Sequence, residues 1–298
     1  MHPNRLIGPI ITTLSLASVP TVAQPLEPLP GIVEDAQRLD QPTAEARFDA
    51  LTALLDDYGL TYEVQTFSNP RATEAGPTEG HNLIVDIGEG ERDLVVGAHY
   101  DAAPLEDGSL SHGMVDNASS VAVLARLAET LSTESLDHRL RILFFDLEEM
   151  QLLGSAHYVS TPDAQRVAAM VNLDINGYGN TVIYGPASND GNTEVYDALE
   201  RVCAAGGHSC LRFGQFPNSD DRSFQAAGIP NISIGLLPSD EARQLHGLLN
   251  GPPPGGPTPP IFGIIHTPND TANHLDASAM TFAYEMVLEL VKELDRSQ

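Results

Sequence analysis

Two histidines and several carboxylates in this chain stand where they could hold a metal ion. His99 and Asp101 lie two residues apart in Gly97-Ala-His-Tyr-Asp101. Residues two apart in an extended segment point to the same side, so this carboxylate can fix the tautomer of a metal-binding imidazole. A histidine and an aspartate at this spacing are more often simply polar residues at the end of a strand, with no metal bound. The motif alone therefore only nominates His99 as a ligand and Asp101 as its partner.

The adjacent acids Glu148 and Glu149 are more informative. They follow the apolar run Leu143-Phe-Phe-Asp146, and neighbouring carboxylates repel each other unless a cation lies beside them. A metal ion is such a cation. One glutamate could bind the metal while the other stays free as the base for a metal-activated water.

Three further residues are candidate ligands. Asp174 ends the apolar segment Val171-Asn-Leu-Asp174, and His266 follows a loop rich in proline and glycine. Asp116 directly precedes an apolar helical segment, where an N-cap is the simpler role, so this segment alone favours a cap over a ligand. The other eight of the ten histidines are interpreted as surface, leader or packing residues.

The charges of these candidates favour two metal ions. Asp116, Glu149 and Asp174 carry one negative charge each, and a bridging hydroxide would add another, which together offset two divalent cations. Imidazole and carboxylate ligands without thiolate suit zinc best, with manganese and cobalt as alternatives. The expected cofactor is a pair of Zn²⁺ ions.

Alternating apolar strands and helices must position these residues. The pattern predicts an α/β fold: a single three-layer domain with a mostly parallel, mixed central sheet and helices on both faces. Three of the strands end at the candidate residues, and functional groups gather at the carboxyl ends of strands in such sheets. Strands are expected at 61–67, 81–87, 93–99, 140–146, 168–174, 181–184 and 231–236, and helices at 44–58, 118–131, 152–159, 193–205 and 277–294.

Composition and the first segment bear on location and partners. Acidic residues outnumber basic ones by 41 to 15, and the net charge of −26 argues against nucleic acid as a partner. Residues 1–23 combine Arg5 with a short apolar stretch and small residues near its end, which is typical of a signal peptide. The stretch is shorter than the roughly 20 residues that span a membrane. We expect a secreted or periplasmic protein without a membrane anchor, whose domain covers 24–298.

The only two cysteines, Cys203 and Cys210, lie in the expected exported part of the chain. Export to an oxidising compartment favours a disulfide between them. A thiolate metal site that also uses His208 is the alternative, but a structural site needs four such ligands. The proline- and glycine-rich segment 250–260 is interpreted as a surface loop within the domain.

Taken in this order, the motifs resemble peptidase family M28, which includes secreted bacterial leucyl-type aminopeptidases. The resemblance covers about residues 81–276, and together its motifs are highly specific. They are Gly97-Ala-His-Tyr-Asp101, Val115-Asp-Asn-Ala-Ser119, Phe144-Phe-Asp-Leu-Glu-Glu149 with Leu153-Gly-Ser155, Asn172-Leu-Asp174 and His266-Thr-Pro-Asn-Asp-Thr271.

This resemblance implies a zinc-exopeptidase-like fold and a role for each ligand. Asp116 would bridge the two zinc ions. Glu149 and His266 would complete one site, and His99 and Asp174 would complete the other. The implied substrate is a peptide, and the protein is expected to be a monomer.

The same resemblance makes Glu148 the general base, while Asp101 would orient His99. The sequence departs from the family at one point. The family often shows Asp-His ahead of the phenylalanine in the segment that aligns with Ser219-Asp-Asp-Arg-Ser-Phe224, and Asp221 occupies the histidine position here.

Three alternatives to an aminopeptidase remain. A carboxypeptidase or dipeptidase could use the same scaffold, because loops such as 252–261 set specificity. Glutaminyl cyclases resemble the family and use a single zinc, but the segment 152–158 follows the two glutamates without the insertion expected of a cyclase. A non-catalytic binding module would lack ligands, whereas all five ligands and the base are present.

Overall fold

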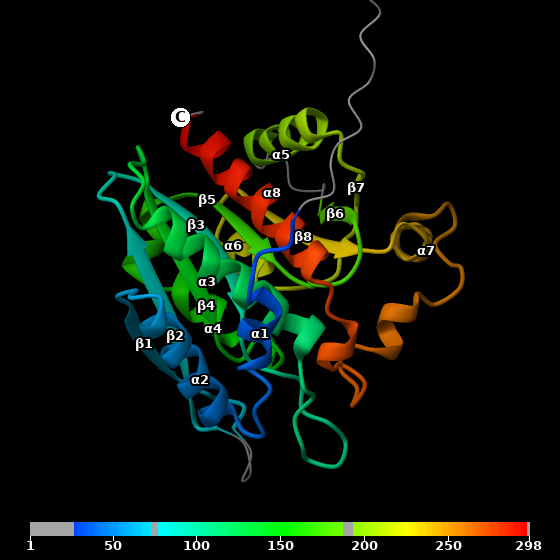
Figure 1. Ribbon diagram of the computed structural model, residues 1–298, viewed down its shortest axis with the longest axis horizontal. Coiled ribbons are helices and arrows are strands. Elements are labelled where there is room, and N and C mark those ends of the chain that lie inside the picture. The colour runs from blue at the N-terminus through cyan, green and yellow to red at the C-terminus, as the bar shows by residue number, and fades with distance from the viewer. Residues whose placement is uncertain (1–26, 73–76, 187–192, 297–298) are drawn as a thin grey trace, which may run out of the picture.

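A mixed eight-stranded sheet forms the centre of the computed structural model, which describes residues 27–72, 77–186 and 193–296 (Figure 1). The expected signal peptide at 1–23 lies outside the described residues. The strands are β1 (Glu63–Ser68), β2 (Glu79–Ile87), β3 (Asp93–His99), β4 (Arg139–Phe145), β5 (Val167–Leu173), β6 (Thr181–Gly185), β7 (Cys210–Arg212) and β8 (Asn231–Leu237).

The strand order in the sheet is β1-β2-β4-β3-β5-β8-β6-β7. The middle of the sheet is parallel, because β3 pairs in parallel with both β4 and β5, and β5 pairs in parallel with β8. On one side β2 runs antiparallel to β4, and on the other β6 runs antiparallel to β8. The prediction of a mostly parallel, mixed sheet in one domain is therefore confirmed.

Helices cover both faces of this sheet (Figure 1). One face carries α1 (Ile32–Gln37), α2 (Ala44–Asp57), α3 (Ser119–Leu131), α5 (Thr193–Gly206) and α8 (Ala277–Arg296). The other carries α4 (Leu153–Val159) and α6 (Asp221–Ala226), and α7 (Ser239–Asn250) packs beside β6. Short turns complete the chain: η1 (Met114–Ala118), η2 (Pro162–Arg166), η3 (Pro260–Gly263) and η4 (Ala272–His274).

The alternation of side chains along buried strands explains the two helical layers. Successive strand residues point to opposite faces, so an unbroken apolar run feeds two cores at once. Leu94 and Val96 of β3 belong to the core under α3 and α8, whereas Val95 between them belongs to the other core. Tyr158 of α4 and Phe224 of α6 close that second core.

Four short or polar elements were not predicted. These are α1, α6, α7 and the edge strand β7. The helices α1 and α6 have six residues each, and β7 has three, which is too short for a periodic apolar pattern to stand out. The segment of α7 is mostly polar and contains Gly247, which weakens a helix prediction although its few apolar residues lie on one face.

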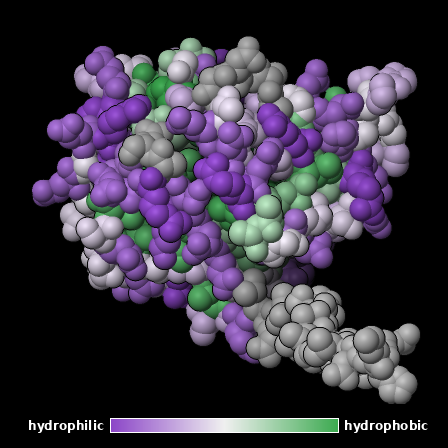
Figure 2. All heavy atoms as spheres, turned by 90° about the horizontal axis from the view of Figure 1, so that it is seen from above, coloured by the Kyte–Doolittle hydropathy of each residue, from purple (hydrophilic) through white to green (hydrophobic). Residues whose placement is uncertain are grey.

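The expected disulfide is present between Cys203 of α5 and Cys210 of β7, which excludes the alternative thiolate metal site. Within the described ranges, no helix is long and apolar enough to cross a membrane. Figure 2 shows a face dominated by hydrophilic residues, with apolar residues in small scattered groups. This surface agrees with the acidic composition of the chain.

Candidate metal centre

Three adjacent parallel strands bring most of the predicted site together. His99 is the last residue of β3, Asp174 directly follows β5, and Glu148 and Glu149 come shortly after β4. Because β4, β3 and β5 are neighbours and run in parallel, their carboxyl ends meet at one edge of the sheet. The strand order therefore places these residues close together.

Asp116 lies between the two histidines of the site. Its Oδ1 is 3.1 Å from Nε2 of His99, and its Oδ2 is 3.0 Å from Nε2 of His266. The cap that its local segment favoured is wrong, because the N-cap of α3 is Ala118, with no side-chain hydrogen bond. Asp116 instead belongs to the turn η1, whose backbone there is not helical.

Two groups of possible ligands share Asp116. One consists of His99, Asp116 and Asp174, and the other of Asp116, Glu149 and His266. In each group the ligand atoms lie within 4.8 Å of one another. The structure thus brings the five predicted ligands together, in two sets with one common carboxylate.

These residues fit metal ions because their buried oxygens need a cation. Oδ1 of Asp174 is buried and accepts no hydrogen bond from the described residues, and the buried Oε1 of Glu149 lies 3.3 Å from Nε2 of His266 without forming a hydrogen bond. Burial raises the pKa of Asp174 to about 7, with the charge of Asp116 adding to it, and burial also raises the pKa of Glu149. Divalent cations would compensate these charges, and histidine with carboxylate is a ligand set that zinc accepts.

Asp101 does more than the sequence indicated. Its Oδ1 lies 3.3 Å from Nδ1 of His99, as expected of an orienting carboxylate. It also accepts the backbone N–H of Glu148 at Oδ1 and that of Glu149 at Oδ2, both at 3.1 Å. One buried carboxylate therefore holds the backbone of both glutamates and lies beside the ring of His99.

We expect Asp101→Asn to weaken zinc binding by about 10- to 100-fold, the usual effect of losing a partner of a metal ligand. Asparagine keeps only one acceptor oxygen, so it cannot serve His99 and both backbone N–H groups. Zinc titration measures the loss. Asp107→Asn, on an exposed turn closed by Ser109, is the matched control. Unchanged zinc affinity in the Asp101 variant would contradict this role.

Sequence reasoning missed the role of Asp270, although it lies in the motif after His266. The carboxylate of Asp270 is fully buried and accepts the backbone N–H groups of Val115, at 2.6 Å, and Asp116, at 3.1 Å. It thus ties the loop that carries His266 to the turn that carries Asp116. The signal in the sequence is an acid four residues after the candidate ligand His266, for which the motif itself supplies no partner.

The segment that departs from the family pattern also lies near the centre. Asp220 and Asp221, at the start of α6, are fully buried. Burial raises the pKa of Asp220 to about 7 and that of Asp221 to about 8, and the charge of Asp174 acts on both. The acids around the site therefore extend beyond the five predicted ligands and Glu148.

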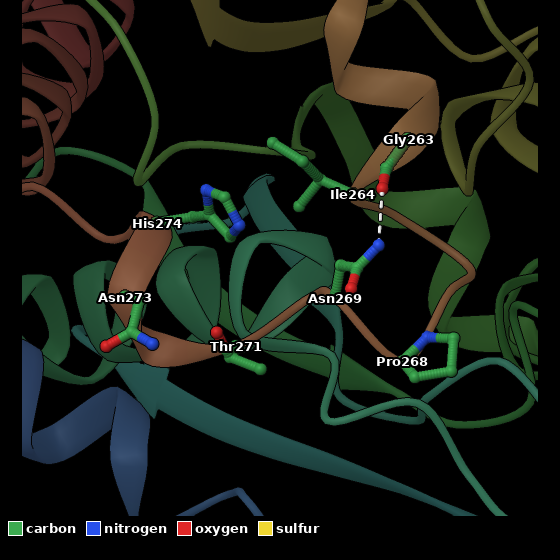
Figure 3. Close-up of a pocket in the computed structure, with 7 residues that line it drawn as sticks. All are labelled: Gly263, Ile264, Pro268, Asn269, Thr271, Asn273 and His274. Carbon is green, nitrogen blue, oxygen red and sulfur yellow. Dashed lines mark hydrogen bonds between the residues drawn. The ribbon is translucent and has the colours of Figure 1, made fainter.

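The centre opens to solvent on the side of His266. The His266 side chain is 56% exposed, whereas that of His99 is 1% exposed. A surface hollow of about 450 Å³ is lined by residues on either side of His266 in the chain, and Asn269 there donates to the carbonyl of Gly263 (Figure 3). None of the five predicted ligands lines this hollow, so it adjoins the His266 loop without being the metal centre.

Comparisons with known proteins agree with this geometry. The model of peptidase family M28 matches residues 82–291. Aminopeptidase YwaD of Bacillus subtilis is 27% identical over 206 residues, which are 67% of this chain and 40% of that protein. This chain therefore spans well under two thirds of the length of that relative.

Solved structures share the fold. BSAP, a zinc aminopeptidase from Bacillus subtilis, matches with a TM-score of 0.59 and 24% identity, over 74% of this chain and 51% of that one. Glutaminyl cyclase from Porphyromonas gingivalis matches with a TM-score of 0.69 and 22% identity, over 88% and 96%. At these identities the likeness concerns the fold alone, and it does not separate a peptidase from a cyclase.

Proposed function

This chain belongs to peptidase family M28, and we propose that it is an aminopeptidase that binds two zinc ions and hydrolyses the N-terminal peptide bonds of its substrates. One observation carries the proposal: two ligand groups share Asp116, and the residue before the ligand Glu149 is a glutamate that neither group uses. His99 and Asp174 would hold one ion, Glu149 and His266 the other.

Glu148 is the proposed general base. Its carboxylate is absent from both ligand groups, and burial raises its pKa, with the charges of Asp220, Asp174 and Glu149 adding to the effect. When bound, zinc would polarise the scissile carbonyl and increase the acidity of water. Glu148 accepts a proton from the attacking water and returns it to the amine nitrogen of the leaving group. Asp101 holds Glu148 in place through the backbone and orients His99.

The charge of the centre favours a free N-terminus as the group recognised. The carboxylate of Glu148 belongs to neither ligand group, and the buried acids Asp220 and Asp221 also lie near the centre. Carboxylates that no metal ion neutralises attract the ammonium group of a peptide. The similarity to a relative named as an aminopeptidase points the same way.

We also propose that the protein acts outside the cytoplasm, as a monomer. A disulfide between Cys203 and Cys210 supports this location, because such bonds persist in oxidising compartments. Fractionation of cells that produce the protein tests the location. Recovery of the protein only in the cytoplasm, with reduced cysteines, would overturn this part of the proposal.

A substrate panel tests the activity. We expect cleavage of aminoacyl anilides and no cleavage of the same anilides with an acetylated N-terminus. N-acetylated dipeptides with a free carboxylate report a carboxypeptidase, and a glutaminyl anilide that is converted to the intact pyroglutamyl anilide with release of ammonia reports a cyclase. Cleavage of blocked substrates, or cyclisation as the main reaction, would overturn the aminopeptidase assignment. The Glu148→Gln protein serves as the blank for contaminating peptidases.

A further inference from the structure

Arg47 of α2 is one of the largest fully buried side chains in the described part of the protein, and it contacts two segments that carry residues of the metal centre. Its guanidinium donates to four backbone carbonyls. Nε donates to Tyr100, Nη1 to Leu39 at 2.5 Å and His112 at 3.0 Å, and Nη2 to Gly113 at 3.0 Å. A single cation therefore joins three separate segments of the chain, around Leu39, Tyr100 and Gly113.

Two of these segments carry residues of the centre. Tyr100 stands between His99 and Asp101, so Arg47 holds the end of β3 at the point where both side chains leave it. Gly113 directly precedes the turn η1 that carries Asp116. Gly113 has a φ of 59°, and a Cβ there would lie 2.9 Å from the Asp116 carbonyl oxygen, so the turn is tightly built.

Asp270 binds the backbone N–H groups of the same turn, whereas Arg47 binds its carbonyls. Arg47 binds the carbonyls of His112 and Gly113, while Asp270 accepts the N–H groups of Val115 and Asp116. The turn that carries Asp116 is thus bound at its carbonyls by the buried cation of Arg47 and at its N–H groups by the buried carboxylate of Asp270.

A purely electrostatic role would not explain the position of Arg47. Burial lowers its pKa, and the nearby charges of Asp101, Asp270 and Asp116 raise it, but an arginine stays charged in proteins. A fixed positive charge near a metal site opposes the binding of further cations. The benefit must come from geometry, because ligands already in position do not have to be ordered when the metal binds.

We propose that Arg47 is a positioning residue that presets His99, Asp101 and Asp116 for metal binding by fixing the backbone of residues 99–101 and 112–116. This inference rests on the proposed function, since it assumes that these residues hold zinc. Two effects of removing Arg47 have opposite signs: loss of its positive charge would tighten zinc binding, whereas loss of the carbonyl contacts would weaken it.

Zinc affinity of metal-free Arg47→Lys and Arg47→Met proteins separates the two effects. Lysine keeps the charge and the aliphatic stem but cannot reach all four carbonyls, and methionine keeps only the apolar volume. We expect both variants to bind zinc at least about tenfold more weakly than the wild type, within the range seen for partners of metal ligands. Competition with a chromophoric chelator measures the affinities, and circular dichroism establishes that each protein is folded.

Arg141→Met is the matched control. Arg141 is 2% exposed and binds Asp86 and Asp163, near the start of β4 and away from the strand ends that carry the site. We expect this variant to lose thermal stability and to keep its zinc affinity.

Three results would overturn the inference. They are unchanged zinc affinity in both Arg47 variants, tighter zinc binding in Arg47→Met with unchanged binding in Arg47→Lys, and failure of both variants to fold while Arg141→Met folds. The last result would mean that Arg47 supports the whole fold rather than the ligand segments. Failure of the wild type to bind zinc would instead contradict the proposed function, so the two failures are distinguishable.

Discussion

Replacing Glu148 by glutamine should reduce hydrolysis of aminoacyl anilides by at least about 10²- to 10⁴-fold while the zinc content stays at the wild-type value. The variant keeps the size of the side chain and the backbone contact from Glu148 to Asp101, so the ligand groups should not move. Glutamine cannot accept the proton of the attacking water, which is why the rate falls. Steady-state kinetics and zinc analysis of the same preparation measure both quantities.

The neighbouring acid supplies the matched comparison. Glu149 belongs to a ligand group, and its Oε1 lies 3.3 Å from Nε2 of His266. Glu149→Gln should therefore lose zinc together with activity, unlike Glu148→Gln. Turnover retained in Glu148→Gln, or zinc lost from it as readily as from Glu149→Gln, would remove the assigned base.

Chelation should abolish hydrolysis, and added zinc should restore it. The zinc content of ligand variants then shows how many ions bind, because Asp116 belongs to both ligand groups and His266 to only one. Wild-type protein dialysed against zinc should hold two ions, His266→Ala should keep one tightly bound ion, and Asp116→Asn should bind both weakly. Elemental analysis of dialysed protein gives the stoichiometry.

A histidine outside the ligand groups supplies the control for these metal-binding variants. His246 lies on α7 against the ring of Phe213 and outside the ligand groups, so His246→Ala should keep both ions and full activity. Activity that survives chelation would contradict any metal mechanism. Equal zinc loss in the His246 and His266 variants would contradict the assigned ligands.

The strands that carry the site could be predicted because their burial on both faces leaves continuous apolar runs. His99, Glu148 and Asp174 stand at the ends of such runs, so the parallel sheet alone placed them together. Asp116 and His266 come from a turn and a loop, and no periodic pattern locates those in space. For Asp116 the local pattern favoured a cap, and only the order of motifs indicated a ligand.

The residues that support the ligands could not be predicted from pattern. Arg47 sits in an amphipathic helix in which a charged residue is expected to face solvent, yet it is fully buried. Its acceptors are backbone carbonyls, which leave no trace in the sequence. Asp270 likewise binds backbone amides. Residues that position ligands through backbone hydrogen bonds can therefore be recognised only from the folded structure.

Anomalous diffraction at the zinc edge, from crystals of protein dialysed against zinc, is the most direct test of the central claim. We expect two peaks, about 3.5–4 Å apart, with Asp116 contacting both. His99 and Asp174 should surround one peak, and Glu149 and His266 the other. Peaks elsewhere on the protein, or no peak at these five side chains, would contradict the account.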